Sequence, residues 1–284
     1  MRSLPGLAEP KPLPKLDVIY QPQGRAREYS DYALNIFEGK CPHECGYCFA
    51  EHLPAACRKD RDPAYRPKRD ILARVERDCE RIERAGGWPE ANGPVLLCFT
   101  GDPYPFGRFD LQAVTDDVIV RLGVVGVPVT VLSKNGVAVK DRVAGRGPIL
   151  FTPEQVTVAT SIVFADLPDS AAVDWEVNAP HVYYRWQALE VAHRYGFRTW
   201  VSVEPVIDPD EALEVIRHGQ ELGCVGHYRI GPLNHHPHAR TVDWPRFGER
   251  LAEVLVETGA RYYLKHDMRR WMPEGFPADN REEA

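Results

Sequence analysis

Three cysteines close together in the chain are the residues best suited to chemistry. Cys41, Cys45 and Cys48 are separated by three and two residues, in the stretch Cys-Pro-His-Glu-Cys-Gly-Tyr-Cys. Inert cysteines usually lie among apolar side chains, whereas these three are surrounded by Pro, His, Glu, Gly and Lys. The spacing and the polar setting predict that the three thiols bind a metal centre.

Two kinds of metal centre agree with three clustered thiols. A structural zinc ion takes four protein ligands, and the remaining cysteines, Cys57, Cys79, Cys98 and Cys224, form no second closely spaced pair. A catalytic zinc ion takes three ligands and a water, although an all-thiolate set is the less usual choice. An iron–sulfur cluster of four irons held by three thiolates leaves one iron open for another ligand.

Composition narrows the class of protein. The chain has 284 residues, with 35 Lys and Arg against 41 Asp and Glu, a net charge of −6 and 44% hydrophobic residues. These values are typical of a soluble globular protein and exclude a globally basic nucleic-acid binder. The seven cysteines and the lack of a signal-peptide pattern or a long apolar run predict a cytoplasmic protein with reduced thiols and no membrane partner.

An alternation of short apolar runs with helical stretches predicts the fold. Each run rich in β-branched residues leads through Gly, Pro, Asp or Asn into a stretch of helical period, as in βα units with a parallel sheet. The expected strands are Tyr32–Phe37, Val95–Thr100, Pro128–Leu132, Thr157–Ile162, Thr199–Val203, His227–Ile230 and Arg261–Leu264. The expected helices are Arg69–Ala85, Asp110–Val124, Tyr184–Tyr195, Asp210–Leu222 and Trp244–Glu257. We predict an α/β fold, a partial (β/α)6 barrel of the TIM type.

The two ends of the chain differ from this pattern. Residues 1–25 are rich in Pro and have few periodic apolar positions, so we expect an extended N-terminal arm. Residues 274–284 are polar and acidic, so we expect a disordered tail. Residues 26–273 form the predicted core with its C-terminal extension.

Polar residues follow two of the expected strands, at the edge where such folds place their chemistry. Thr100, Gly101 and Asp102 offer carboxylate and carbonyl acceptors for an ammonium group, or they form a turn before the next helix. Ser133 and Lys134 end the third strand, where the lysine suits a carboxylate or is simply solvated.

The cysteine motif, with an aromatic residue before its last cysteine and a position after the first strand, resembles the signature of the radical S-adenosylmethionine (radical SAM) superfamily. Later segments, up to about Trp271, are similar to spore photoproduct lyase-like members. The resemblance implies a [4Fe-4S] cluster on Cys41, Cys45 and Cys48 whose open iron binds S-adenosyl-L-methionine (SAM). It also implies reductive cleavage of SAM to a 5′-deoxyadenosyl radical, and a one-electron reductant of flavodoxin or ferredoxin type as partner.

The same resemblance implies the residues that contact SAM. The aromatic residue of the motif packs near the adenine, the turn after the second strand contacts the methionine amino group, and the lysine after the third strand binds the carboxylate. Residues on the next two strands contact the ribose, the carboxylate, the adenine or the substrate. In chain order these residues are Tyr47, Thr100, Gly101, Asp102, Ser133, Lys134, Ser161, Glu204 and Val206.

Cys98 bears on the fate of the substrate radical. Spore photoproduct lyase quenches its substrate radical with a cysteine on the second strand, and the resemblance implies the same catalytic role for Cys98. Its register differs by one residue from the lyase pattern, so strand alternation could turn it to the other face. A buried structural cysteine is therefore the alternative.

The substrate itself is not determined by these motifs. The lyase acts on a thymine dimer in DNA, and the basic stretch at residues 58–69 suits phosphates or forms a solvated loop. His235, His236 and His238 form a metal tract or a polar loop facing the substrate, and Lys265 and Asp267 are expected in the barrel mouth.

Three functions follow from these motifs. The leading one is a radical SAM enzyme that abstracts a hydrogen from an unknown substrate, with nucleic acid as one class. The alternative is a zinc-stabilised nucleic-acid-binding module without catalysis. An iron–sulfur electron carrier is disfavoured, because a small carrier does not need a barrel of this length.

Overall fold

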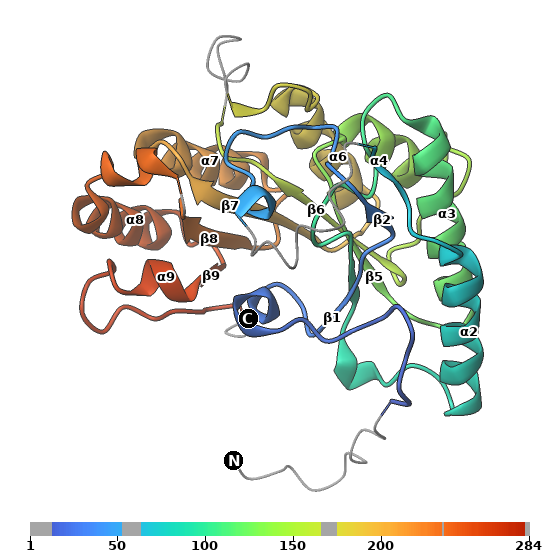
Figure 1. Ribbon diagram of the computed structural model, residues 1–284. Coiled ribbons are helices and arrows are strands. Elements are labelled where there is room, and N and C mark those ends of the chain that lie inside the picture. The colour runs from blue at the N-terminus through green and yellow to red at the C-terminus, as the bar shows by residue number, and fades with distance from the viewer. Residues whose placement is uncertain (1–12, 53–63, 166–174, 235, 282–284) are drawn as a thin grey trace, which may run out of the picture.

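A parallel sheet of seven strands forms the centre of the part that the computed structural model describes, residues 13–52, 64–165, 175–234 and 236–281. The sheet is curled into a half-barrel (Figure 1), and each strand pairs with the next one along the chain. The strands are β1 (Tyr32–Leu34), β4 (Val95–Leu97), β5 (Val129–Leu132), β6 (Val156–Ser161), β7 (Thr199–Val206), β8 (Tyr228–Pro232) and β9 (Tyr262–Leu264). The predicted partial barrel of the TIM type is therefore confirmed, and β9 forms its last strand at the expected position Arg261–Leu264.

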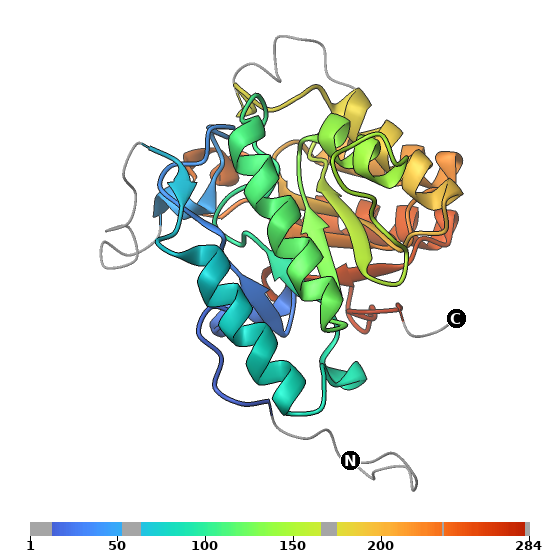
Figure 2. The same cartoon turned by 90° about the vertical axis from the view of Figure 1, so that its right-hand side faces the viewer.

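A helix links each strand of the sheet to the next and packs on its outer face (Figures 1 and 2). These helices are α2 (Ile71–Arg84), α3 (Phe109–Val124), α4 (Gly136–Val143), α6 (Val182–Arg194), α7 (Pro209–Leu222) and α8 (Trp244–Thr258). Neighbours pack in pairs, α2 with α3, α4 with α6 and α7 with α8. No helix in the described part of the chain has the length and apolarity needed to cross a bilayer.

Shorter elements complete the described structure. The 3-10 helices are η1 (Gly24–Glu28), η2 (Phe49–His52), η3 (Glu90–Asn92) and η4 (Pro237–Arg240), and the short helix α9 (His266–Arg269) follows β9. Strands β2 (Phe37–Glu38) and β3 (Arg66–Pro67) pair antiparallel in a small second sheet.

Local chemistry sets the bounds of the helices. The Asp208 side chain accepts hydrogen bonds from the backbone N–H groups of Asp210 and Glu211, and Pro209 stands at the first helical position of α7. Gly223 ends the helix with a φ of 62°, a left-handed conformation that glycine adopts without strain. These signals can be read from sequence, and they agree with the predicted helix Asp210–Leu222.

Several elements differ from the predictions. The expected strand Tyr32–Phe37 divides into β1 and β2, and the second strand ends at Leu97 because Cys98 has a φ of 56°, outside the extended region. Strand β7 continues to Val206. Helix α4 was not predicted; Asn135 starts it by accepting from the backbone N–H of Ala138, but eight residues are too few to reveal a helical period.

The described part of the N-terminal arm docks on α2. Asp78, which is fully buried on this helix, accepts hydrogen bonds from the backbone N–H groups of Asp17, Val18 and Ile19 at 2.6, 2.8 and 3.2 Å. A buried carboxylate needs such donors, because an unpaired one would cost several kcal/mol. Residues 13–23 are thereby held against the barrel.

The segment that follows the arm closes the side of the half-barrel between β1 and β9. The Glu28 carboxylate accepts from the backbone N–H of His266 at 2.7 Å and from the Tyr263 hydroxyl at 3.2 Å. Arg229 on β8 donates to the backbone carbonyl of Glu28 at 2.9 Å. Strands far along the chain therefore bind the segment that precedes β1.

The chain beyond residue 273 returns to β9 in its described part. Asp279 forms an antiparallel bridge with Tyr263, and the Asn280 side chain accepts from the backbone N–H of Tyr262 at 2.6 Å. Residues 274–281 thereby cover the outer edge of the sheet, so that β9 is not left as an open edge strand.

Candidate active site

The three cysteines of the motif lie on one short loop beyond the end of β1 and β2. Two tight turns shape this loop: the backbone N–H of Glu44 donates to the Cys41 carbonyl at 3.2 Å, and that of Cys48 donates to the Cys45 carbonyl at 3.0 Å. All three thiols are free and half-buried. Burial raises the pKa of Cys41 to about 12 and also raises that of Cys45. A metal centre bound here must therefore displace protons from thiols.

The donor chemistry of this loop fits an iron–sulfur cluster. Thiolates are the usual ligands of such clusters, and each one binds a different iron atom, so the sulfurs stand further apart than the ligands of a single ion. In the described part of the chain, no three His, Cys, Asp or Glu side chains are gathered closely enough to hold one metal ion. The fit to a cluster thus rests on the thiol chemistry of the loop, which supplies three cysteine ligands.

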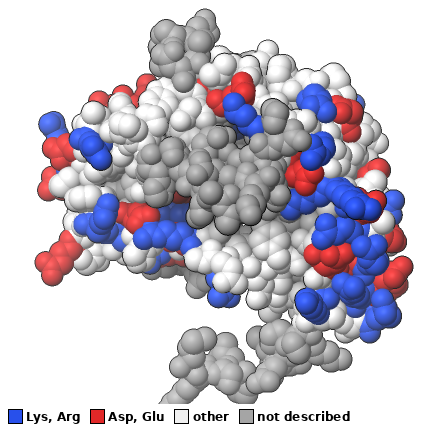
Figure 3. All heavy atoms as spheres, viewed as in Figure 1, with Lys and Arg blue, Asp and Glu red and all other residues white. Residues whose placement is uncertain are grey.

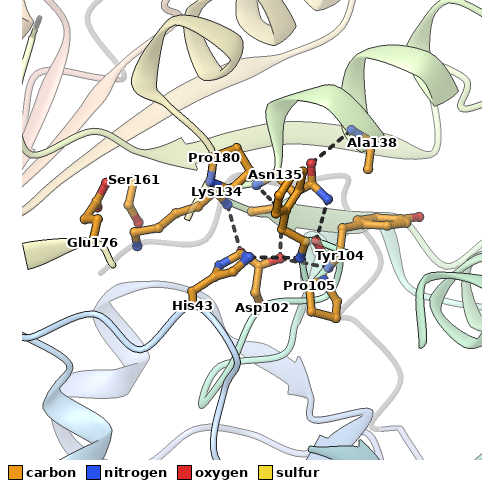
Figure 4. A network of polar contacts seen from close by, with 12 residues as sticks. His43, Asp102, Tyr104, Pro105, Lys134, Asn135, Ala138, Ser161, Glu176 and Pro180 are labelled. Atoms are coloured by element: carbon orange, nitrogen blue, oxygen red, sulfur yellow. Dashed lines mark hydrogen bonds and ion pairs between the residues drawn. The ribbon is translucent and has the colours of Figure 1, made fainter. Parts of the chain in front are cut away.

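Asp102 links the cysteine loop to the ends of β4 and β5 (Figure 4). Its Oδ1 accepts from the Ser133 hydroxyl at 2.7 Å and from the backbone N–H of Tyr104 at 2.8 Å. Its Oδ2 accepts from the backbone N–H of Lys134 at 2.8 Å and lies 3.3 Å from Nδ1 of His43. Burial raises the pKa of this carboxyl, but His43 and these hydrogen bonds outweigh burial and lower it to about 2.

The four donors around Asp102 limit what this turn can offer a ligand. A carboxylate has about four acceptor positions, and the protein itself occupies all four here. The backbone carbonyl of Asp102 accepts from the Tyr65 hydroxyl at 3.0 Å. The side chain of Asp102 thus acts within the protein as a positioning group, and contacts of Thr100 and Gly101 with an amino group stay predictions. Gly101 is required here, because a Cβ at this position would lie 2.2 Å from the Tyr65 hydroxyl.

Lys134 extends from the Asp102 network toward Ser161 and Glu176 (Figure 4). Its ammonium lies 5.4 Å from the centroid of the Tyr47 ring. Burial lowers the pKa of Lys134, but Cys45 and Glu176 nearby raise it overall, so this side chain stays cationic. A cation held beside the cysteine loop is suited to bind a carboxylate.

Tyr47 is held by a buried carboxylate from a distant segment. Its hydroxyl donates to Glu176, which also receives a hydrogen bond from Arg185 on α6. Arg185 is fully buried and donates to the Ser161 carbonyl at 3.0 Å as well. Burial raises the pKa of Glu176, but Arg185 and Lys134 lower it overall. The ring of Tyr47 and the end of β6 are therefore tied to the same buried ion pair.

Glu204 lies in a second polar cluster, at the end of β7. The Lys265 ammonium is 3.4 Å from Glu204 and 3.5 Å from Glu28, and it lies 4.0 Å from the centroid of the Tyr29 ring. Burial and the neighbouring Glu204 raise the pKa of Tyr29 well above its usual value, so its phenol donates to Glu204. Val206 is fully buried in the main core. Glu204 is thus paired within the protein before any ligand binds.

Cys98 lies just beyond β4 and packs into the main hydrophobic core near Tyr65 and Phe37. It is 5% exposed, and burial raises the pKa of its thiol to about 12. Backbone N–H groups of Ile36 and Phe37 interact with its sulfur. These surroundings favour the alternative of a structural cysteine, and the role of hydrogen donor stays a prediction.

The described residues of the histidine tract, His236 and His238, pack on Trp175 beside the cysteine loop. The rings of His236 and His238 lie 5.0 and 5.5 Å from that of Trp175, which in turn lies 6.4 Å from Tyr47. Lys265 shares the cluster around Glu204, whereas Asp267 pairs with Arg25. His235, Cys57 and the Arg58–Arg61 part of the basic stretch lie outside the described residues.

Sequence reasoning missed four residues that shape the site. They are His43, Tyr29, Glu176 and Arg185, buried or half-buried polar residues that each have a partner well separated from them in the chain. His43 carried a weak signal as a polar residue inside the cysteine motif. The other three carried none, because only the fold shows which polar residues of a loop, an arm or a helix turn inward.

The surface around the site carries charges of both signs. Figure 3 shows Lys and Arg side chains gathered at the edge formed by α2, with Asp and Glu between them. Arg66 pairs with Glu38 at 3.0 Å, and Arg69 lies 3.5 Å from Asp70. In the described part of the basic stretch, Arg66 and Arg69 therefore each lie beside a carboxylate.

Comparisons with known proteins bear on the fold. No family model and no curated protein sequence matches the chain. Among solved structures, a mutant of spore photoproduct lyase is 14% identical with a TM-score of 0.54, and the match covers 91% of this chain and 78% of that one. The lyase complexed with dinucleoside spore photoproduct has a TM-score of 0.53 at 14% identity, with the same coverage. SuiB from Streptococcus suis bound to S-adenosylmethionine has a TM-score of 0.48 at 14% identity, over 80% of this chain and 48% of that one. The chain therefore has the fold of spore photoproduct lyase, which is the fold that its cysteine motif led us to expect.

Proposed function

We propose that this protein is a radical SAM enzyme that abstracts a hydrogen atom from its substrate. Cys41, Cys45 and Cys48 would hold a [4Fe-4S] cluster, and SAM would lie between this loop and the ends of β4, β5 and β6. When bound, these groups supply a 5′-deoxyadenosyl radical through one-electron cleavage of SAM. The observation that carries the proposal is a thiol-rich loop on a barrel shared with spore photoproduct lyase, with a cation beside it.

The protein's own residues would bind and orient SAM. Lys134 offers its ammonium to the carboxylate, and the carbonyl groups and hydroxyl of the Thr100–Gly101 turn remain as acceptors for the amino group. The ring of Tyr47, held by Glu176, offers a fixed apolar face next to the same lysine. The segment ending at Tyr29 covers the open side of the barrel, which limits the access of water to a reactive radical.

The substrate and the electron donor are proposed only by class. One of the similar structures holds a dinucleoside spore photoproduct, so a nucleic-acid-derived substrate is the first class to test. The electron would come from a one-electron reductant of flavodoxin or ferredoxin type. Lys265 and Glu204 lie in the interior cluster where a substrate would approach.

The test begins with anaerobic purification and reconstitution with iron and sulfide. Dithionite and SAM are then added, 5′-deoxyadenosine is measured by chromatography, and EPR spectra are recorded before and after SAM. We expect brown protein, a change of the EPR spectrum on adding SAM and release of 5′-deoxyadenosine.

Two other outcomes would each favour one of the alternative functions. Colourless protein that holds one zinc ion per chain and releases no 5′-deoxyadenosine would overturn the proposal in favour of the zinc-stabilised nucleic-acid-binding module. Brown protein whose cluster does not respond to SAM would favour an electron carrier.

A further inference from the structure

His43 is a buried histidine inside the cysteine motif, midway between Cys41 and Cys45. Its side chain is 2% exposed. The histidine ring does not face the solvent, and both of its nitrogens have partners within the protein: Phe106 on one side and Asp102 on the other. His43 belongs to the cysteine loop, whereas Asp102 and Phe106 belong to the loop between β4 and α3.

The two contacts define which nitrogen of His43 carries the proton. The backbone N–H of Phe106 donates to Nε2 at 3.1 Å, so Nε2 has to be an unprotonated acceptor. Nδ1 lies 3.3 Å from Oδ2 of Asp102, so Nδ1 carries the hydrogen and donates it to the carboxylate. In this geometry Nδ1 of His43 is the donor to Asp102 and Nε2 is the acceptor from the Phe106 backbone.

The Asp102 carboxylate connects His43 to the backbone of Lys134. The carboxylate oxygen that faces His43 also accepts from the backbone N–H of Lys134 at 2.8 Å, and the other oxygen accepts from the Ser133 hydroxyl at 2.7 Å. The cysteine loop and the lysine of the β5 end are therefore joined through one buried carboxylate. No other hydrogen bond among the described residues joins His43 to the β5 end.

We propose that His43 is a positioning residue that sets the distance between the cysteine loop and Lys134 through Asp102. This inference rests on the proposed function, because the two parts it aligns are those assigned to the cluster and to the SAM carboxylate. Without the imidazole, Asp102 loses one donor and the Phe106 N–H loses its acceptor, so both loops must shift or take up water. The thiols themselves are untouched by such a shift.

The test compares His43→Leu and His43→Asn with the wild type after identical anaerobic reconstitution. Iron per chain is measured first, and the affinity for SAM is then measured by calorimetry and by the SAM-induced EPR change. We expect His43→Leu to keep the wild-type iron content and to bind SAM at least about tenfold more weakly, the size of one lost hydrogen bond to a charged group. His43→Asn places an amide N–H near the position of Nδ1, so it should recover most of that loss.

A matched control uses a histidine with no such contacts. His193 is exposed on α6, and His193→Leu should bind SAM as the wild type does. Wild-type SAM affinity in His43→Leu would overturn the proposal. If His43→Asn and His43→Leu bind SAM equally weakly, the link through Asp102 is overturned. If both variants also lose iron, His43 acts by holding the cysteine loop in the shape that binds the cluster, and the proposal is likewise overturned.

A second measurement does not depend on the variants or on the cluster. Nitrogen-15 NMR of the metal-free wild type at neutral pH should show His43 protonated on Nδ1 and unprotonated on Nε2. The opposite tautomer would contradict the geometry proposed here. If the wild type shows this tautomer but neither binds SAM nor releases 5′-deoxyadenosine, the proposed function fails while the contact between His43 and Asp102 stands.

Discussion

The ammonium of Lys134 lies 5.4 Å from the centroid of the Tyr47 ring. Tyr47 belongs to the cysteine motif and Lys134 follows β5, so the fold unites two residues that the sequence placed in separate segments. Glu176 contributes to both, because it accepts from the Tyr47 hydroxyl and raises the pKa of Lys134. A flat ring, a cation and a loop of thiols thus share one edge of the barrel.

Replacing Lys134 tests the carboxylate contact. Lys134→Gln removes the cation and should weaken SAM binding by about tenfold to a hundredfold, since hydrogen bonds between charged groups contribute about 1.5–3 kcal/mol. Iron content should not change. Calorimetry on the reconstituted protein measures the effect, and Lys140→Gln on α4 is the control, because Lys140 contacts Gln187 on the outer face. Equal affinity in Lys134→Gln and wild type would remove this lysine from the SAM site.

The choice of cluster ligands is tested by single cysteine variants. Cys41→Ala, Cys45→Ala and Cys48→Ala should each lose the cluster, because a three-thiolate site has no spare ligand. Cys224→Ala should retain it, since Cys224 is buried in the main core. Iron and sulfide analysis after reconstitution gives the result, and equal loss in all four variants would mean that the ligands are wrongly assigned.

Glu176→Gln should destabilise the metal-free protein. The change leaves Arg185 buried without a negative partner, and breaking a buried ion pair in this way costs about 3–5 kcal/mol. Urea denaturation followed by circular dichroism measures the free energy of unfolding. Glu214→Gln is the matched control: its pair with Arg217 is 4.0 Å long and exposed, so a change below about 1 kcal/mol is expected. Similar losses in both variants would contradict a buried role for Glu176.

The low pKa of Asp102 predicts that the folded protein loses stability in acid. Its pKa is about 2 in the folded protein against 3.8 for the ordinary carboxyl, so the unfolded chain takes up the proton first as the pH falls. The stabilisation, about 2 kcal/mol, is fully present above pH 4 and disappears as the pH falls toward 2. Carbon-13 NMR of the Asp102 carboxyl in the metal-free protein measures the folded pKa directly, and a midpoint near 4 would contradict the hydrogen-bonded network.

Cys98→Ala distinguishes a structural cysteine from a hydrogen donor. Removing a buried sulfur should lower the free energy of unfolding by about 1–2 kcal/mol. Release of 5′-deoxyadenosine should persist at the wild-type rate, because the thiol is enclosed by Tyr65 and the core. Once a substrate is known, products are compared by chromatography, and a change in the product formed by Cys98→Ala would restore the donor role.

Much of the fold could be predicted from local patterns. All seven strands of the sheet overlap an expected one, because apolar runs closed by Gly, Pro, Asp or Asn are local signals. The ends of helix α7 could also be predicted, because Asp208 and Gly223 are local capping signals. Helix α4 was missed because its start depends on a single capping side chain, Asn135, and its length is eight residues. Cys98 was placed on β4 because its left-handed φ has no signature in a non-glycine residue.

The sequence by itself determined which groups are available for chemistry, since three thiols at a fixed spacing and a lysine after a strand are properties of residue type and order. Only the tertiary structure decided how these groups are held. Glu176 meets Tyr47 across 129 positions of the chain, and Asp102 meets His43 across the barrel edge. Such contacts follow from where parallel strands end beside one another, and a buried polar group finds its partner only once that edge has formed.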